Sequence, residues 1–432
     1  MDKTVYIGLL GAGTVGSGVI EVLNKNASEI EARVGAPVKI KKVLVRDAKK
    51  VRDGLDKATV TDSFDDILND KDISIVVEVM GGMNPAKDYM LRAFNAGKCV
   101  VTANKDVIAA CGKELFDAAK KNSADLHFEA SVGGGIPIIT PLKQSLTANK
   151  ITEIMGIVNG TTNYMLTKMT EVGADYDAVL KEAQEKGYAE ANPSADVDGL
   201  DAARKAAILA SLAFNTRISL DDVAVEGITK ITPEDIAFAR ELGYVIKLLA
   251  VGKDIPSKGI DVRVHPVLLP DSHPLSAVNG VFNAIFVRGN AIGEAMFYGP
   301  GAGSLPTASA VVADIIDTAR DILYGAVGRI GCTCYNEKPL CPVEETESSY
   351  YVRLLVKDEP GALGNIATAF GKNGVSLKSV VQTTKAVKHK AEIVVITHLV
   401  KHKNILGTME LLNTLPVVDT IKNVIRVENE EC

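Results

Sequence analysis

A lysine and an aspartate four positions apart form the most suggestive pair of reactive side chains in the sequence. Asp201 and Lys205 fall in the segment Gly199–Phe214, which is otherwise rich in alanine, leucine and isoleucine. This segment predicts a helix, and residues four apart share one face of a helix. An inward-facing ion pair on such an apolar helix is costly unless it has a function. We therefore interpret the pair as a candidate for proton transfer, with an ordinary surface ion pair as the alternative.

A glycine motif near the N-terminus indicates a dinucleotide site. Gly11, Gly13 and Gly16 give the pattern G-x-G-x-x-G directly after an apolar strand and before a helical pattern, which is the context the motif requires. The first glycine allows a tight turn, the second lets a pyrophosphate approach the backbone, and the third permits close helix–strand packing. Thr14 and Val15 begin the helix, whose N-terminus attracts phosphate. A glycine turn without a ligand is the alternative.

The residues after the second predicted strand bear on the choice of cofactor. Arg46 lies where the 2′-phosphate of a bound NADP(H) is expected, and Lys49 and Lys50 follow it. A guanidinium matches phosphate geometry, so the sequence favours NADP(H). Asp47 keeps NAD(H) as an alternative, because an acidic residue here binds the ribose hydroxyls of NAD. A solvated charge cluster would explain the same residues without a ligand.

The pattern of predicted elements indicates an α/β protein. Residues 1–150 alternate strands and helices, which predicts a Rossmann-type parallel sheet domain that binds NAD(P). Residues 151–304 mix strands with long helices, one of them predicted over 233–247, which indicates an α+β domain. We expect this domain to serve substrate binding, catalysis and dimerisation. We expect a helix within 305–330 to pack back onto the first domain.

The C-terminal part of the chain predicts a separate small domain. Residues 331–349 are polar and contain prolines, which is typical of a linker. Residues 350–432 follow the order βαββαβ of a ferredoxin-like fold. The linker composition predicts that this domain is a separable module.

Composition excludes several classes of function. The net charge is −6 and no basic stripe is present, so we expect no nucleic-acid partner. No segment reads as a signal peptide or a membrane span, which predicts a cytoplasmic protein. The six cysteines are too sparse for a disulfide framework. Cys332, Cys334 and Cys341 cluster, which leaves a thiolate metal site as an alternative to reduced bystander thiols.

Three motifs resemble the homoserine dehydrogenase family. They are Thr102-Ala-Asn-Lys105, Asn159-Gly-Thr-Thr-Asn-Tyr164, and the segment from Gly187 through Glu190 to Lys205. The resemblance covers roughly residues 4–330. It implies NAD(P)H-dependent reduction of L-aspartate 4-semialdehyde to L-homoserine, a reversible step in the biosynthesis of threonine, methionine and isoleucine.

The resemblance also implies residue roles. Lys205 is the expected proton donor and acceptor, and Lys105 assists it while contacting cofactor and substrate. Glu190 and Asp201 are expected to hold the ammonium group of the substrate. The remaining expected contacts are Asn159, Thr161 and Tyr188 to the substrate, and Gly187, Gly301 and Gly303 to the cofactor.

A further glycine-rich loop resembles the monovalent-cation site of the same family. In that reading, Glu129 and the backbone carbonyls of Val132, Gly134 and Ile136 surround Na⁺, and oxygen ligands suit such hard cations. The alternative is a glycine turn that only holds the chain together.

The turn Asp358-Glu-Pro-Gly361-Ala-Leu363 resembles the signature of ACT domains, which bind amino acids. Asp358, Gly361 and Leu363 are the expected effector contacts, and L-threonine, the pathway end product, is the expected inhibitor. An ACT domain that only mediates assembly is the alternative, and a homodimer or homotetramer is expected. The alternative for the whole chain is an amino-acid-responsive regulatory protein with a non-catalytic Rossmann domain. Retention of Lys105, Glu190, Asp201 and Lys205 together argues against that alternative.

Overall fold

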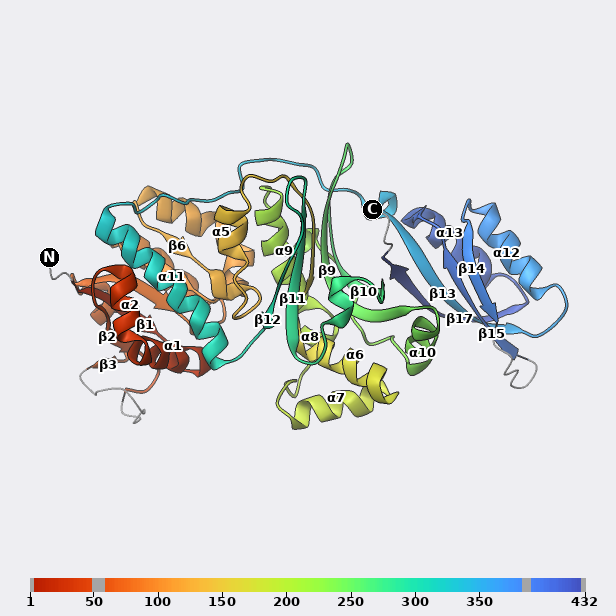
Figure 1. Ribbon diagram of the computed structural model, residues 1–432, viewed down its shortest axis with the longest axis horizontal. Coiled ribbons are helices and arrows are strands. Elements are labelled where there is room, and N and C mark those ends of the chain that lie inside the picture. The colour runs from red at the N-terminus through yellow and green to blue at the C-terminus, as the bar shows by residue number, and fades with distance from the viewer. Residues whose placement is uncertain (1–3, 49–58, 383–389, 429–432) are drawn as a thin grey trace. The chain divides into compact units, whose positions relative to one another are not determined.

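The computed structural model describes residues 4–48, 59–382 and 390–428 (Figure 1). The chain divides into two compact units. The first contains residues 1–154, 207–222 and 283–337, and the second contains residues 155–206, 223–282 and 338–432. No helix in the described ranges is long and apolar enough to cross a membrane.

The first unit is built on a six-stranded sheet whose neighbouring strands are all parallel. The central strands are buried runs of valine, isoleucine and leucine, as expected for strands covered on both faces. The strand order confirms the predicted Rossmann-type domain. In spatial order the strands are β3 (Val60–Thr61), β2 (Val38–Leu44), β1 (Val5–Leu10), β4 (Ile73–Glu78), β5 (Cys99–Thr102) and β6 (Leu126–His127); the helices are α1 (Thr14–Lys25), α2 (Ala27–Val34), α3 (Asp65–Leu68), α4 (Ala86–Asn95) and α5 (Lys105–Lys121).

A later helix completes the core of this unit. Helix α11 (Ser304–Tyr324) packs its apolar stripe against the same core as β1 and α1, and it lies beside α1 in Figure 1. A Cβ on Gly18 would lie 2.6 Å from the backbone oxygen of Ser304, so a glycine is required where the two helices meet. The strands β11 (Phe282–Gly289) and β12 (Gly293–Pro300) precede α11.

The second unit contains a long antiparallel hairpin that the sequence pattern did not predict. The prediction of one helix over 233–247 is wrong: α10 (Pro233–Glu241) ends before Gly243, whose φ is 79°. The chain then forms β9 (Tyr244–Ile255), which pairs along its whole length with β10 (Gly259–Pro270). Short apolar runs fit helix and strand alike, and the pairing with β10 decides the outcome.

The other elements of the middle region are mostly helical. Strand β7 and helix α9 each cross the boundary between the two units in sequence. The elements are β7 (Ile151–Ile157), α6 (Gly160–Val172), α7 (Tyr176–Glu185), α8 (Ser194–Val197), α9 (Leu200–Ala213), β8 (Ala224–Val225), and the short 3₁₀ helices Leu220–Asp222 and Pro274–Ala277.

The C-terminal domain has the predicted βαββαβ order. Its long strands run in the spatial order β17-β13-β15-β14 and are antiparallel, and residues from the strands and both helices form one apolar core. This arrangement confirms the ferredoxin-like fold. The elements are β13 (Glu347–Lys357), α12 (Ala362–Lys372), β14 (Leu377–Gln382), β15 (Lys390–Thr397), β16 (Val400–Lys401), α13 (His402–Asn413) and β17 (Val418–Val427), after a 3₁₀ turn at Val343–Glu345.

The C-terminal domain contacts the rest of the second unit through more than its linker. Strand β17 pairs in parallel with β10, and Leu340 of the linker bridges to Ile260 of the same strand. The Arg353 guanidinium donates to the fully buried carboxylate of Asp235 in α10, at 2.8 Å. Sheet pairing and a buried ion pair therefore bind this domain to the rest of the second unit.

Candidate active site

The glycine-rich loop has the geometry expected of a dinucleotide site. Gly11 has a φ of 105°, a value that glycine adopts without strain. A Cβ on Gly16 would lie 2.1 Å from the Gly11 oxygen, whereas a Cβ on Gly13 would meet no described atom within 4 Å. Gly16 is thus required by packing between loop and helix. Gly13 leaves open space at the N-terminus of α1, where Thr14 and Val15 lie and where a pyrophosphate can approach.

A polar network lies at the carboxyl edge of the parallel sheet, at the ends of β4 and β5. Strand β4 is the neighbour of β1, which leads into the glycine-rich loop. The buried Glu78, at the end of β4, accepts the Thr102 hydroxyl at 2.6 Å and the Met80 backbone N–H at 2.8 Å. Asn104 caps α5 through its side chain, and Lys105 is the first residue of that helix. Ligands of such folds bind at this edge. Glu78 was not predicted as a site residue, although an acidic residue at the end of an apolar strand indicates a polar site at that edge of the sheet.

The residues expected to select the cofactor follow β2. Arg46 and Asp47 are both exposed directly after this strand, so the guanidinium is accessible to a ligand. Lys49 and Lys50 lie outside the described residues. The position of Arg46 is compatible with a 2′-phosphate contact.

Lys205 is held in a buried setting by Asp201 on α9 and by Val158, the residue after β7. Its ammonium donates to the Asp201 carboxylate at 2.7 Å and to the Val158 carbonyl at 2.7 Å. The two charged side chains are only 12% and 11% exposed, which excludes an ordinary surface pair. An ammonium has three N–H donors, so among the described residues these two bonds leave one N–H for a ligand.

Asn159 connects the lysine pocket to a second carboxylate. Its side-chain N–H donates to Asp201 at 3.0 Å and to Asp196 at 2.7 Å, while its oxygen caps α6 at Thr162. Burial raises the pKa of Asp196, and the charge of Asp201 raises it further. The structure therefore brings Asn159, Asp201 and Lys205 together. It adds Asp196, for which no role was predicted although it lies in the family-like segment from Gly187 to Lys205.

The remaining expected substrate residues lie around the end of α7. The Thr161 hydroxyl donates to the Tyr188 carbonyl at 2.6 Å, and the Tyr188 ring packs edge-on against Tyr164. Gly187 has a φ of 74°, which turns the chain at this point. Glu190 is exposed, so its carboxylate is accessible from solvent.

The predicted cation loop is tightly hydrogen-bonded. The buried Glu129 carboxylate accepts three backbone N–H groups of residues 138–140, at 2.6 to 2.7 Å. Within the described residues, no backbone N–H of a turn or loop donates to the carbonyl oxygens of Val132, Gly134 and Ile136. Carbonyl and carboxylate oxygens are the ligand type that a hard cation prefers. The three N–H bonds also give Glu129 a structural role.

The loop that contains Gly301 and Gly303, both predicted to contact the cofactor, is explained in part by close packing. A Cβ on Gly301 would lie 2.0 Å from the Asn283 side chain, and one on Gly134 would lie 2.4 Å from the Gly301 oxygen. Gly303 has a φ of 123° and precedes α11. The Ser304 hydroxyl donates to the Thr14 carbonyl at 2.7 Å, which places this loop next to the dinucleotide loop.

The clustered cysteines are all free thiols. Arg217 donates to the Cys332 sulfur at 3.3 Å. A hydrogen bond from Cys334, together with this guanidinium, lowers the pKa of Cys332 to about 5. The backbone of Cys341 bonds instead to Ile260 of β10.

The predicted effector turn opens the first helix of the ferredoxin-like domain. Gly361 has a φ of 88° and is the N-terminal cap of α12. Asp358 and Leu363 are exposed, the latter by 42%. An exposed apolar side chain beside a helix N-terminus can contact an amino acid whose carboxylate lies at that terminus.

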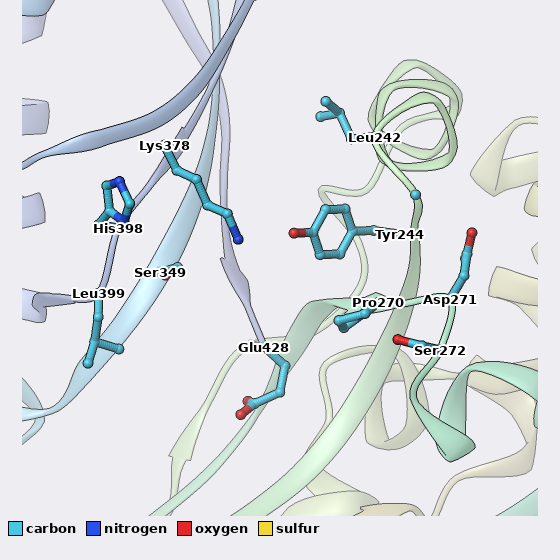
Figure 2. A pocket seen from close by; sticks show the side chains of 11 residues that line it. Leu242, Tyr244, Pro270, Asp271, Ser272, Ser349, Lys378, His398, Leu399 and Glu428 are labelled. Atoms are coloured by element: carbon cyan, nitrogen blue, oxygen red, sulfur yellow. The ribbon is translucent and has the colours of Figure 1, made fainter. Parts of the chain in front are cut away.

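The same unit contains a large open cavity away from this turn. It measures about 750 Å³ and is lined by β9, β10 and the ferredoxin-like strands, with Asp358, Gly361 and Leu363 outside its lining. Figure 2 shows Lys378 and Tyr244 reaching into it from opposite walls.

Comparisons with known proteins identify relatives across the whole chain. Residues 11–129 match the family described as the NAD-binding domain of homoserine dehydrogenase, residues 137–316 match homoserine dehydrogenase, and residues 350–417 match the ACT domain. The chain is 46% identical to a homoserine dehydrogenase of Bacillus subtilis, covering 99% of both chains. It is 47% identical to one of Synechocystis, covering 98% of this chain and 99% of that relative.

Solved structures agree with these matches. A homoserine dehydrogenase from Thiobacillus denitrificans superposes with a TM-score of 0.94 at 40% identity, covering 99% of both chains. A hyperthermophilic archaeal homoserine dehydrogenase in complex with NADPH gives a TM-score of 0.62 at 30% identity, covering 73% of this chain and 97% of that one.

Proposed function

Because this chain belongs to the homoserine dehydrogenase family, we propose that it reduces L-aspartate 4-semialdehyde to L-homoserine with NADPH. The observation that supports this reaction is the Lys205 pocket. A buried ammonium with two N–H groups fixed and one available can hold and protonate a carbonyl oxygen. The same group accepts the proton in the reverse oxidation.

The reaction needs one hydride and one proton. The dihydronicotinamide supplies the hydride to the aldehyde carbon when the cofactor is bound. Lys205 gives a proton to the carbonyl oxygen, so that the aldehyde becomes the primary alcohol of homoserine. Asp201 and the Val158 carbonyl hold the ammonium in place, which limits the reorganisation needed during the step.

The substrate's amino-acid end requires an anionic partner. We assign its ammonium group to Glu190, whose carboxylate is exposed. Asp201 is assigned mainly to orienting Lys205, because one of its oxygens already binds both Lys205 and Asn159. Thr161 and Tyr188 complete the assigned substrate contacts.

The cofactor is assigned to the glycine-rich loop and the sheet edge of the first unit. Gly13 and the N-terminus of α1 would hold the pyrophosphate, and Lys105 would contact cofactor and substrate. Arg46 favours NADP(H), and the archaeal relative solved with NADPH supports this preference. The loop from Glu129 to Ile136 is assigned a Na⁺ ion that fixes its backbone.

Substitution of the two lysines tests the catalytic assignment. Lys205→Ala and Lys105→Ala should each lower kcat by about 10²–10⁴-fold, the usual cost of losing a general acid–base group. Lys168→Ala, which removes an exposed ion pair on α6, is the matched control and should leave kcat unchanged. Circular dichroism establishes that each variant is folded. Folded Lys205 and Lys105 variants with wild-type kcat would overturn the assignment.

We further propose that L-threonine inhibits the enzyme through the ACT domain. The turn at Gly361 provides a helix N-terminus that can bind the carboxylate of threonine. The pairing of β17 with β10 connects the ACT domain to the part of the second unit that contains Lys205. Asp358→Asn should weaken inhibition, by up to the 5–150-fold typical of allosteric coupling, without changing KM for the semialdehyde. Lys378→Gln, in the cavity of Figure 2, is the control on the same domain. Unchanged inhibition in Asp358→Asn with purely competitive kinetics would place threonine in the active site instead.

A further inference from the structure

Three potential metal ligands lie together between β6, the last strand of the parallel sheet, and the end of α11. None of them has a role in the proposed reaction. Asp125 directly precedes β6, His127 ends that strand, and Asp321 lies in the last turn of α11. One ligand atom from each lies within 4.8 Å of the other two. All three belong to the first unit.

The carboxylate of Asp125 is buried and incompletely satisfied. Its side chain is 4% exposed, and one oxygen accepts the Gly328 backbone N–H at 2.8 Å. The other oxygen is buried and has no hydrogen-bond partner among the described residues. A buried carboxylate oxygen without a partner is costly, so this position calls for a cation or a proton.

The cationic side chains near the cluster do not occupy the position that a bound cation would take. Asp321 is 7% exposed and lies 3.3 Å from the Arg329 guanidinium, which is about half exposed and can turn toward solvent. Lys143 adds positive charge near Asp125, but neither Lys143 nor Arg329 bonds to the free oxygen. Asp125 lines part of an open cavity of about 590 Å³, whereas His127 and Asp321 lie outside its lining, so ions approach the cluster from the Asp125 side.

We infer that Asp125, His127 and Asp321 bind a divalent metal ion of the zinc or manganese class. One imidazole and two carboxylates suit these ions. Metal–ligand distances near 2.1 Å place ligand atoms roughly 3.4 Å apart, so the side chains close slightly around the ion, and water fills the remaining positions. The ion joins β6 to the end of α11 and thereby stabilises the first unit. This site is separate from the catalytic lysines and does not depend on the proposed reaction.

Thermal unfolding of the full-length protein tests the inference. The protein is treated with a chelator, dialysed, and heated with Zn²⁺, Mn²⁺ or Mg²⁺ alone. Zn²⁺ or Mn²⁺ should raise Tm by about 5 °C at a hundred-fold excess over Kd, whereas Mg²⁺ should have little effect. Electron paramagnetic resonance of Mn²⁺ should show one bound ion per chain.

Variants determine whether the effect comes from these ligands. Asp125→Asn and Asp321→Asn should abolish the rise in Tm, and Asp317→Asn, one turn earlier on α11, should retain it. His127→Gln serves if either aspartate variant fails to fold. The inference is overturned if neither metal changes Tm, or if the ligand variants respond as the wild type does. A chelator-treated Asp125→Asn protein that is more stable than wild type, with no metal response in either, would show that the pocket holds a shared proton.

Discussion

Replacing Arg353 by methionine should destabilise the second unit by about 3–5 kcal/mol, the usual cost of removing one partner of a buried ion pair. Asp235 is fully buried, and Arg353 is 3% exposed. The guanidinium lies 2.8 Å from the carboxylate, and methionine keeps much of the side-chain volume while removing the charge. The variant therefore leaves the buried Asp235 carboxylate without the positive charge that stabilises it.

The remaining partners of Asp235 set the size of the effect. The Asn423 side-chain N–H donates to the Asp235 carboxylate at 2.8 Å, and the Tyr351 hydroxyl donates to the same carboxylate at 3.2 Å. The Thr232 backbone N–H and hydroxyl donate to it as well, at 3.1 and 3.2 Å. Four neutral hydrogen bonds at roughly 1 kcal/mol each offset part of the cost of the buried charge but do not neutralise it. The double variant Asp235→Leu/Arg353→Met removes both charges and should cost less than the single Arg353 variant, because replacing a whole buried pair by apolar groups is often nearly neutral.

Urea unfolding measures these differences. The chain has no tryptophan, so circular dichroism and tyrosine fluorescence report the transition. The two single variants and the double variant form a cycle whose interaction energy should exceed about 2 kcal/mol. A loss below about 1 kcal/mol for Arg353→Met, or additive single effects, would refute a buried pair that holds the ACT domain to α10.

Three further outcomes follow from other sites. Gly16→Ala should lower Tm because its Cβ would lie 2.1 Å from a backbone oxygen, whereas Gly13→Ala should keep Tm and raise the cofactor KM; the reverse pattern would contradict the loop assignment. Arg46→Ala should raise KM for NADPH much more than for NADH, and equal effects would remove its role in 2′-phosphate binding. Burial lowers the pKa of Lys247 to about 8, while an unfolded lysine titrates near 10.4. Wild-type stability should therefore rise with pH between these values, relative to Lys247→Met; parallel urea-denaturation profiles at pH 7.5 and pH 10 would contradict this.

Local patterns in the sequence were enough to predict several features of this protein. The glycine motif lies between a strand and a helix as predicted, because its turn and packing requirements are set within a few residues. Asp201 and Lys205 meet because helix geometry alone places residues four apart on one face. The βαββαβ order of the ACT domain was likewise readable from periodicity.

Other features depended on contacts between distant parts of the chain. Residues 244–255 form a strand because β10 pairs with them, and local periodicity does not contain that partner. The docking of the ACT domain rests on Asp235 and Arg353, which are far apart in sequence. Asp196 and Glu78 gain their roles only when folding brings Asn159 and Thr102 beside them. The sequence determined which residues could react, and tertiary packing decided which polar groups are buried together, because burial and long-range pairing depend on the whole fold.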